Sequence, residues 1–174
     1  MTTQTESPRI YVACLAAYNN GILHGVWIDA TDDDIHEQIQ AMLAASPMPE
    51  HCEEYAIHDY SGFYGMHLSE YEDLARVHDL AVLIEKHGEA FAKYCDNMGD
   101  DADEDSFEEA FQGHWDSELA FTENLIDDLG LLHDVPEILQ RYFDTESYAR
   151  DLFLGGDYYS IESSEGGIFV YSNC

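Results

Sequence analysis

The sequence predicts an α+β fold, arranged as an elongated chain of three small domains with sheets at both ends and helices in the middle. Two patterns and one bulk property predict it. Short apolar runs bounded by Asn, Gly and Pro, typical of strands, lie near both ends, whereas apolar residues at helical spacing fill the centre. A formal net charge of -31 at pH 7 on 174 residues favours a row of small units, because spreading the charges reduces their repulsion.

The first domain, residues 1–62, is predicted to begin with a β-hairpin. Residues 10–17 and 22–29 are apolar runs of strand length. The Asn-Asn-Gly sequence between them is typical of a tight turn, so the two strands are expected to pair with each other.

One helix and a third strand complete the first domain. Thr31 is expected to cap the helix, whose first turn carries three aspartates where the positive end of the helix dipole favours carboxylates. Pro47 and Pro49 are expected to end it, since proline cannot continue a helix. Residues 55–60 then read as a third strand before a Ser-Gly turn.

The middle domain, residues 63–104, is predicted to be helical. Ser69 is expected to cap a helix with apolar residues at helical spacing, and Gly88 is expected to end that helix. A second helix is predicted to follow directly, over residues 89–97.

The third domain, residues 105–174, is predicted to mix helices with a sheet. Phe107 and Phe111 lie four residues apart on a short helix, and Trp115 is expected to close a short strand. Three further helices and a terminal hairpin are predicted over residues 117–129, 137–143 and 147–154, and over residues 158–162 and 168–171.

The chain contains no complete catalytic, metal-binding or phosphate-binding motif, so we expect no enzyme, no cofactor and no metal site. His36 and Glu37 begin like the HExxH motif of zinc proteases, but Gln40 occupies the place of the second histidine. The aspartates from Asp101 onward begin like a calcium-binding loop, but Ser106 replaces the required glycine.

The cysteines and the apolar runs favour a cytoplasmic protein. No Cys-x-x-Cys pair is present, so reduced structural thiols are expected rather than a zinc or redox site. The longest apolar-looking run, residues 10–18, is too short to span a bilayer. The acidic excess argues against direct binding to nucleic acid or to an anionic membrane. The cysteines are Cys14, Cys52, Cys95 and Cys174.

The excess of 37 Asp and Glu over 6 Lys and Arg needs a physical reason, because such repulsion opposes a compact fold. The charge alone allows a decoy for a basic protein surface, a halophilic protein, or an acidic surface that serves only solubility. The carboxylates run through every segment instead of forming one acidic tail, which suits a groove that normally follows a phosphate backbone. The expected acidic surface comprises Asp32, Asp33, Asp34, Glu37, Glu70, Glu72, Asp73, Asp100, Asp101, Asp103, Glu104, Asp105, Glu108, Glu109, Asp116, Glu118, Glu123, Asp127 and Asp128.

Stretches near both ends of the chain resemble one protein family. Residues 10–21 (IYVACLAAYNNG) and 25–29 (GVWID) resemble the start of the ArdA antirestriction proteins. Residues 131–144 (LLHDVPEILQRYFD) are similar to the antirestriction motif of that family, and residues 148–157 (YARDLFLGGD) are similar to the segment that follows it.

The resemblance implies a DNA mimic encoded on mobile genetic elements such as conjugative plasmids or transposons. Such a protein inhibits type I restriction-modification enzymes by occupying the DNA-binding groove of their methyltransferase core, and it catalyses nothing. The resemblance also implies a homodimer formed through the third domain. An acidic chaperone for basic nucleic-acid-binding proteins, or a halophilic protein, is the alternative. The motif would lie at or near the dimer contact through Leu131, Leu132, Asp134, Val135, Pro136, Glu137, Ile138, Leu139, Tyr142, Phe143 and Asp144.

Overall fold

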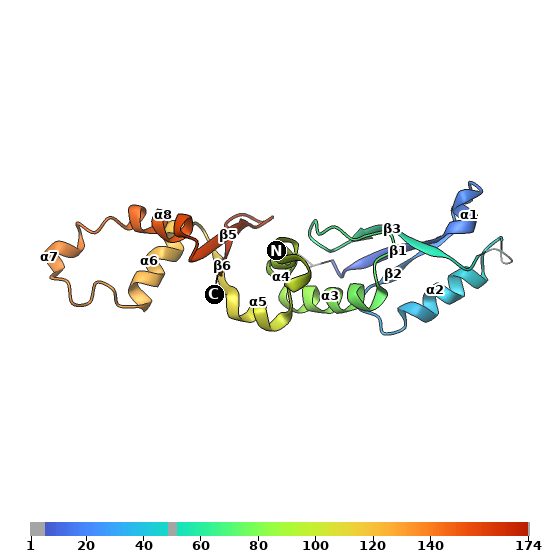
Figure 1. The fold of residues 1–174 in the computed structure, drawn as a ribbon, viewed down its shortest axis with the longest axis horizontal. Coiled ribbons are helices and arrows are strands. Elements are labelled where there is room, and N and C mark those ends of the chain that lie inside the picture. The colour runs from blue at the N-terminus through green and yellow to red at the C-terminus, as the bar shows by residue number, and fades with distance from the viewer. Residues whose placement is uncertain (1–5, 49–51, 174) are drawn as a thin grey trace. The chain divides into compact units, whose positions relative to one another are not determined.

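A computed structural model describes residues 6–48 and 52–173, apart from the side chain of Asp100, and it confirms the predicted α+β class. This part of the chain contains eight α-helices and two three-stranded antiparallel sheets (Figure 1). The chain divides into two compact units, Met1–Asp101 and Ala102–Cys174, with one sheet in each. The division into three domains stays a prediction, and the predicted helix-ending role of Pro49 lies outside the described residues.

The sheet of the first unit has the order β2-β1-β3, with β1 (Arg9–Cys14) between β2 (Gly25–Asp29) and β3 (Tyr55–Ser61). Both neighbours are antiparallel to β1, which confirms the predicted pairing of the first two strands and the third strand. The predicted start of the second strand at residue 22 is wrong, because β2 begins at Gly25. The predicted extension of the first strand to residue 17 is wrong. The Cys14 sulfur accepts the N–H of Ala17 over 3.5 Å, and this cap starts a short helix, α1 (Leu15–Asn19).

Helix α2 (Ile35–Ala44) covers this sheet on the side of β1 and β2. Its buried side chains repeat at helical spacing and form a core with the buried strand residues. The predicted cap at Thr31 and the predicted first turn over the three aspartates are wrong, because α2 begins only at Ile35. The Thr31 N–H and hydroxyl both donate to the Asp29 carboxylate, over 3.0 and 2.7 Å, in the turn that precedes the helix. Asp34 occupies the N-cap position instead.

Two helices and a short 3-10 turn complete the first unit: α3 (Leu74–His87), α4 (Glu89–Met98) and η1 (Gly99–Asp101). Gly88 ends α3 as predicted, with a φ of 71° that glycine adopts at little cost. The predicted cap at Ser69 is wrong. Asp73 caps α3, because the carbonyl of Glu70 accepts the N–H of Ile57 over 2.8 Å and holds this segment outside the helix.

The second unit begins with α5 (Glu104–Ala110), followed by β4 (Phe111–Trp115) and α6 (Glu118–Asp128). It continues with α7 (Glu137–Gln140), α8 (Thr145–Gly155), β5 (Tyr158–Glu162) and β6 (Ile168–Ser172). The sheet order is β4-β6-β5, so the predicted terminal hairpin and the strand ending at Trp115 are confirmed. Helix α7 is shorter than predicted, because Tyr142 and Phe143 continue the chain in turns.

Aromatic side chains form much of the core of the second unit. Phe107 stacks on Phe111 with ring centres 5.0 Å apart, and Phe111 lies 5.7 Å from the ring of the fully buried Tyr171. On α6, Phe121 packs edge-on against Trp115 at 5.6 Å. Such pairs join the helices to the sheet through large buried rings.

Cys14 and Cys52 form a disulfide, which corrects the expectation of reduced thiols for this pair. The bond joins the end of β1 to the segment that leads into β3, and it closes a sequence separation of 38 residues. Cys95 is a buried free thiol. Among the described residues, no helix combines the length and apolar character needed to cross a bilayer.

Candidate functional surface

The predicted acidic residues lie on the molecular surface. Among all residues with described side chains, no Asp or Glu is buried, and the buried polar residues are Ser46, Thr122 and Ser172. Of the predicted carboxylates, three are half-buried and the others with described side chains are exposed. The side chain of Asp100 lies outside this description. The half-buried ones are Glu72, Glu104 and Glu118.

The charge is shared almost equally between the two units. The first unit holds 19 Asp and Glu against 4 Lys and Arg, a formal charge of -15. The second holds 18 against 2, a formal charge of -16. An acidic tail would concentrate the negative charge at one end of the chain. The even division therefore indicates two acidic surfaces, one on each unit.

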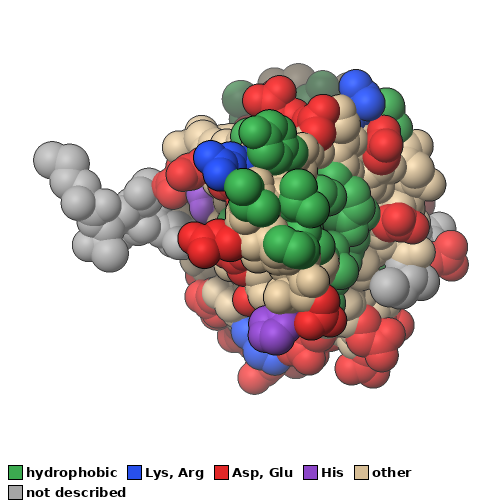
Figure 2. Space-filling model, turned by 90° about the vertical axis from the view of Figure 1, so that its left-hand side faces the viewer, with side chains coloured by type: hydrophobic (Ala, Val, Ile, Leu, Met, Phe, Trp, Pro, Cys, Tyr) green, Lys and Arg blue, Asp and Glu red, His purple; other side chains and the backbone are tan. Residues whose placement is uncertain are grey.

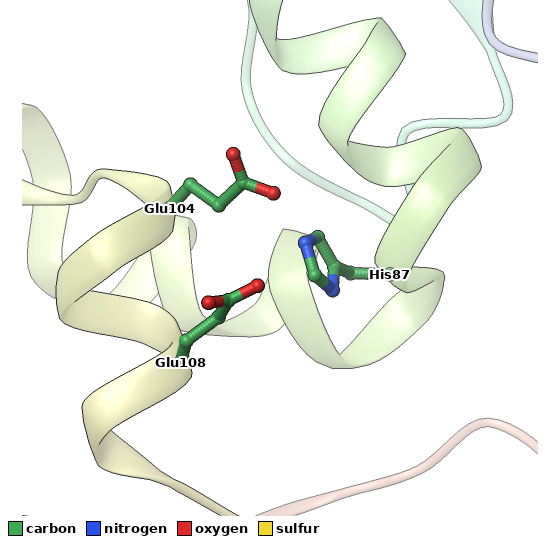
Figure 3. A group of neighbouring side chains, drawn as sticks. All are labelled: His87, Glu104 and Glu108. Carbon is green, nitrogen blue, oxygen red and sulfur yellow. The ribbon is translucent and has the colours of Figure 1, made fainter.

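Helix α5 shows how densely the carboxylates are placed. Glu104 and Glu108 lie one turn apart on this helix (Figure 3), and Asp105 and Glu109 repeat the same spacing beside them. Like charges four residues apart destabilise a helix, so these acidic pairs lower the stability of α5. A capping box offsets part of the cost, because the Asp103 carboxylate accepts the Ser106 N–H over 2.7 Å. Ser106, which stands where a calcium loop needs glycine, therefore has a structural role.

The acidic residues before α2 are held in place by neighbouring polar side chains. The Gln38 side-chain amide donates to Asp32 over 2.9 Å and to Asp34 over 2.7 Å. His78 on α3 donates from Nδ1 to the Ala30 carbonyl over 3.1 Å and lies 3.8 Å from the Asp33 carboxylate. The first unit thus brings the start of α2 and helix α3, and with them two of the predicted acidic segments, into one neighbourhood.

The cations do not neutralise this surface. Arg76 pairs with Glu72 at 3.5 Å and Arg150 with Asp151 at 3.5 Å, in both cases on the same local segment. The guanidinium of Arg9 lies over the Trp27 ring, 5.7 Å from its centre. Six cations against 37 acids leave a large excess of uncompensated negative charge at neutral pH.

The predicted antirestriction motif forms an exposed apolar surface. Residues 129–144, which include α7, extend beyond the ends of α6 and α8 (Figure 1). Figure 2 shows hydrophobic side chains gathered at the centre of the face that carries α7, with acidic side chains around them. Ile138 is 61% exposed and Tyr142 76% exposed, values far from those of a core. We call the following residues the motif patch: Leu131, Ile138, Leu139, Tyr142 and Phe143.

The remaining motif residues have other positions. Leu132 and Val135 are half-buried, whereas Asp134, Pro136 and Glu137 are exposed. Asp144 is the N-cap of α8, where its carboxylate accepts the Ser147 N–H over 2.9 Å and the Ser147 hydroxyl over 2.7 Å. These hydrogen bonds lower the pKa of Asp144 below its usual value of 3.8, and the bond from the Ser147 backbone N–H has the larger effect.

Gln140 organises the motif, a role that was not predicted from the sequence. Its side-chain amide donates to the carbonyl oxygens of Leu132 and Val135, over 3.1 and 2.9 Å, across the loop. Arg141 donates from Nε to the Ile138 carbonyl over 3.2 Å, and its guanidinium lies over the Tyr142 ring at 5.8 Å. A polar residue inside an apolar, Pro-containing loop is the sequence signal that points to such a role, because buried carbonyl groups need donors.

A comparison with protein-family models matches residues 10–165 of the chain to the family described as antirestriction protein (ArdA). The matched range contains the acidic segments and the whole motif patch. The search of curated proteins found no match.

Proposed function

Because this chain belongs to the ArdA family of antirestriction proteins, we propose that it inhibits type I restriction-modification enzymes by mimicking B-form DNA. Family membership implies the antirestriction function, and the mechanism and the enzyme class are what we propose. In this mechanism the protein occupies the DNA-binding groove of the methyltransferase core. The family is one of inhibitors and not a known enzyme family, and the proposed mechanism requires neither catalysis nor a cofactor.

The observation that carries the proposal is the exposure of the carboxylates throughout both units. A groove that binds duplex DNA meets about one phosphate charge per 1.7 Å of helix axis with its own Lys and Arg side chains. Carboxylates fixed on helices and turns offer those cations alternative partners. Because the contacts are many and individually weak, the affinity is expected to depend on their number more than on any one of them.

The motif patch supports a homodimer. Five large apolar side chains on one loop are exposed to water, and such a patch rimmed by polar residues marks an interaction site. A second copy is a suitable partner, because a two-fold interface uses the same surface on both subunits. Two copies carry twice the formal charge of -31, which lengthens the array of carboxylates available to an enzyme groove.

Competition with DNA tests the proposal. Purified protein is titrated against labelled duplex bound to a type I methyltransferase, with an unrelated basic DNA-binding protein in parallel. We expect displacement of DNA from the methyltransferase at concentrations that leave the unrelated protein unaffected, and weaker displacement as salt rises. Equal inhibition of both proteins would instead indicate an acidic chaperone. Loss of circular dichroism structure in dilute buffer, regained in concentrated salt, would indicate a halophilic protein.

A further inference from the structure

The second unit contains a groove about 550 Å³ in volume that none of the predicted functions uses. It lies between α6, α8 and β5, and its apolar wall is formed by Leu119, Ala149, Phe153 and Leu154. Leu154 is 80% exposed. A volume of this size accommodates several side chains, and an exposed leucine on its wall indicates apolar surface that a partner can cover.

Two carboxylates make this groove acidic. Glu118 has one oxygen engaged, since Oε1 accepts the Ser160 hydroxyl over 2.7 Å. Glu146 makes no hydrogen bond or ion pair with any residue that the structure describes. The cation of the groove, Arg150, is directed along its own helix to Asp151 at 3.5 Å. The groove therefore suits an apolar segment that carries a cation.

The motif patch is such a segment. Arg141 lies in the sequence between the patch residues Leu139 and Tyr142. Arg141 is one of only two Lys or Arg residues in the second unit. Within the described part of the chain, Arg141 forms no ion pair, and its Nε bond to the Ile138 carbonyl lays the side chain along the patch. An unpaired arginine among exposed apolar residues complements an apolar groove with two carboxylates.

We propose that the α6–α8–β5 groove of one copy receives the motif patch of a second copy, with Arg141 of the second copy pairing with Glu146 and Glu118. Each copy has one patch and one groove, so a two-fold axis satisfies both contacts at once and closes the assembly as a dimer. The arginine pairs also offset the repulsion between two chains that each carry a formal charge of -31. This inference rests on the homodimer of the proposed function and adds the surface that the patch contacts.

Charge reversal in the full-length protein tests the pairing by sedimentation velocity at moderate salt. Arg141→Glu and Glu146→Arg are each expected to weaken dimerisation by at least about tenfold, because each puts like charges together. The double variant restores opposite charges at the 141–146 pair but leaves Glu118 facing a carboxylate, so it is expected to return part of the affinity. Lys86→Glu and Glu165→Arg change the net charge equally at exposed sites elsewhere and are expected to have little effect.

Apolar substitutions separate this inference from the proposed dimer itself. Leu154→Ser is expected to weaken the dimer as strongly as the single charge reversals, and its exposure makes a folding defect unexpected. If Leu139→Asp gives monomers while the charge reversals and Leu154→Ser leave the dimer intact, the groove proposal is wrong and the motif contact stands. A double variant no better than the weaker single variant also contradicts the pairing. A monomeric wild-type chain would contradict both dimer proposals. The DNA competition experiment would still test the DNA mimicry, because it does not depend on the dimer.

Discussion

The side-chain amide of Gln140 donates a hydrogen bond to the carbonyl oxygen of Val135 over 2.9 Å, and the same amide bonds to the Leu132 carbonyl. Gln140 thus supplies a donor to the Val135 carbonyl and adds a second donor to the Leu132 carbonyl, which also accepts the Val135 N–H over 3.0 Å. The exposed side chains of the motif patch stand on a loop whose shape depends on these two bonds.

Gln140→Glu is therefore expected to loosen residues 131–143, because a carboxylate cannot donate to two carbonyl groups. The loss is expected to be about 1–3 kcal/mol of local stability, the usual cost of a buried polar group without a partner, because the Val135 carbonyl loses its donor whereas the Leu132 carbonyl keeps the Val135 N–H. Amide hydrogen exchange of these residues measures it, with Gln40→Glu on the exposed side of α2 as the control. Unchanged protection in Gln140→Glu would show that packing alone holds the loop.

The Cys14–Cys52 disulfide is expected to stabilise the first unit. Closing a separation of 38 residues restricts the unfolded chain, and the chain-entropy relation gives about 4 kcal/mol for a loop of this length. Thermal unfolding with and without a reductant measures the effect, with the Cys14→Ser/Cys52→Ser variant as the control that should no longer respond. An equal response of that variant to reductant would assign the effect to another thiol.

Gly25 is expected to tolerate no larger residue. A Cβ atom at this position would lie 2.6 Å from the Val12 carbonyl oxygen and 2.7 Å from the Tyr11 ring, inside the β1–β2 pair. Gly25→Ala is expected to cost about 1–3 kcal/mol of stability in a thermal or urea unfolding measurement, since the Val12 carbonyl oxygen belongs to the paired backbone of β1 and cannot easily move away. Gly155→Ala, with open space around its Cβ, is the matched control. Equal stability of the two variants would contradict the close packing of Tyr11 on Gly25.

The cap of α5 is expected to add stability at neutral pH and to lose it only in acid. Hydrogen bonds from Ser106 hold the pKa of Asp103 below 3.8, and the bond from its backbone N–H has the larger effect. Because the folded state holds the carboxylate ionised more strongly than the unfolded chain does, this contribution is complete above the unfolded pKa of 3.8 and falls as pH drops through the lower folded value. The stability difference between wild type and Asp103→Ala, followed by circular dichroism during acid titration, measures it. A difference that disappears already between neutral pH and 3.8 would contradict the assignment.

Local patterns predicted much of the fold. Gly88 and the paired glycines before Ile168 marked true ends and turns, because positive φ angles favour glycine. The missed caps have a common cause. Thr31 and Ser69 are good cap residues in sequence, but both lie before the true start of their helix. Thr31 is held in a turn by its bonds to Asp29, and the bond of Ile57 in β3 to the Glu70 carbonyl keeps the Ser69 segment extended before α3.

The acidic residues of the candidate surface could be predicted from the sequence, but the individual roles of some of them could not. Exposure of the carboxylates follows from the cost of burying charge, so the acidic residues could be assigned to the surface directly. The separate role of Asp103 as a helix cap, and that of Asp144, depend on local geometry that the charge pattern does not contain. The disulfide was missed because Cys14 and Cys52 are distant in sequence and meet only when β1 and the segment before β3 come together.

The central claim is that many exposed carboxylates act together in place of phosphates. Affinity for a type I methyltransferase is measured for Asp33→Asn, Glu70→Gln and Asp127→Asn singly and combined, at several salt concentrations, after circular dichroism and sedimentation confirm folded dimers. We expect each single change to weaken binding by less than about threefold, the combination to weaken it much more, and the salt dependence to fall with every charge removed. Abolition of binding by one neutral substitution, or an unchanged salt dependence in the combined variant, would contradict the account.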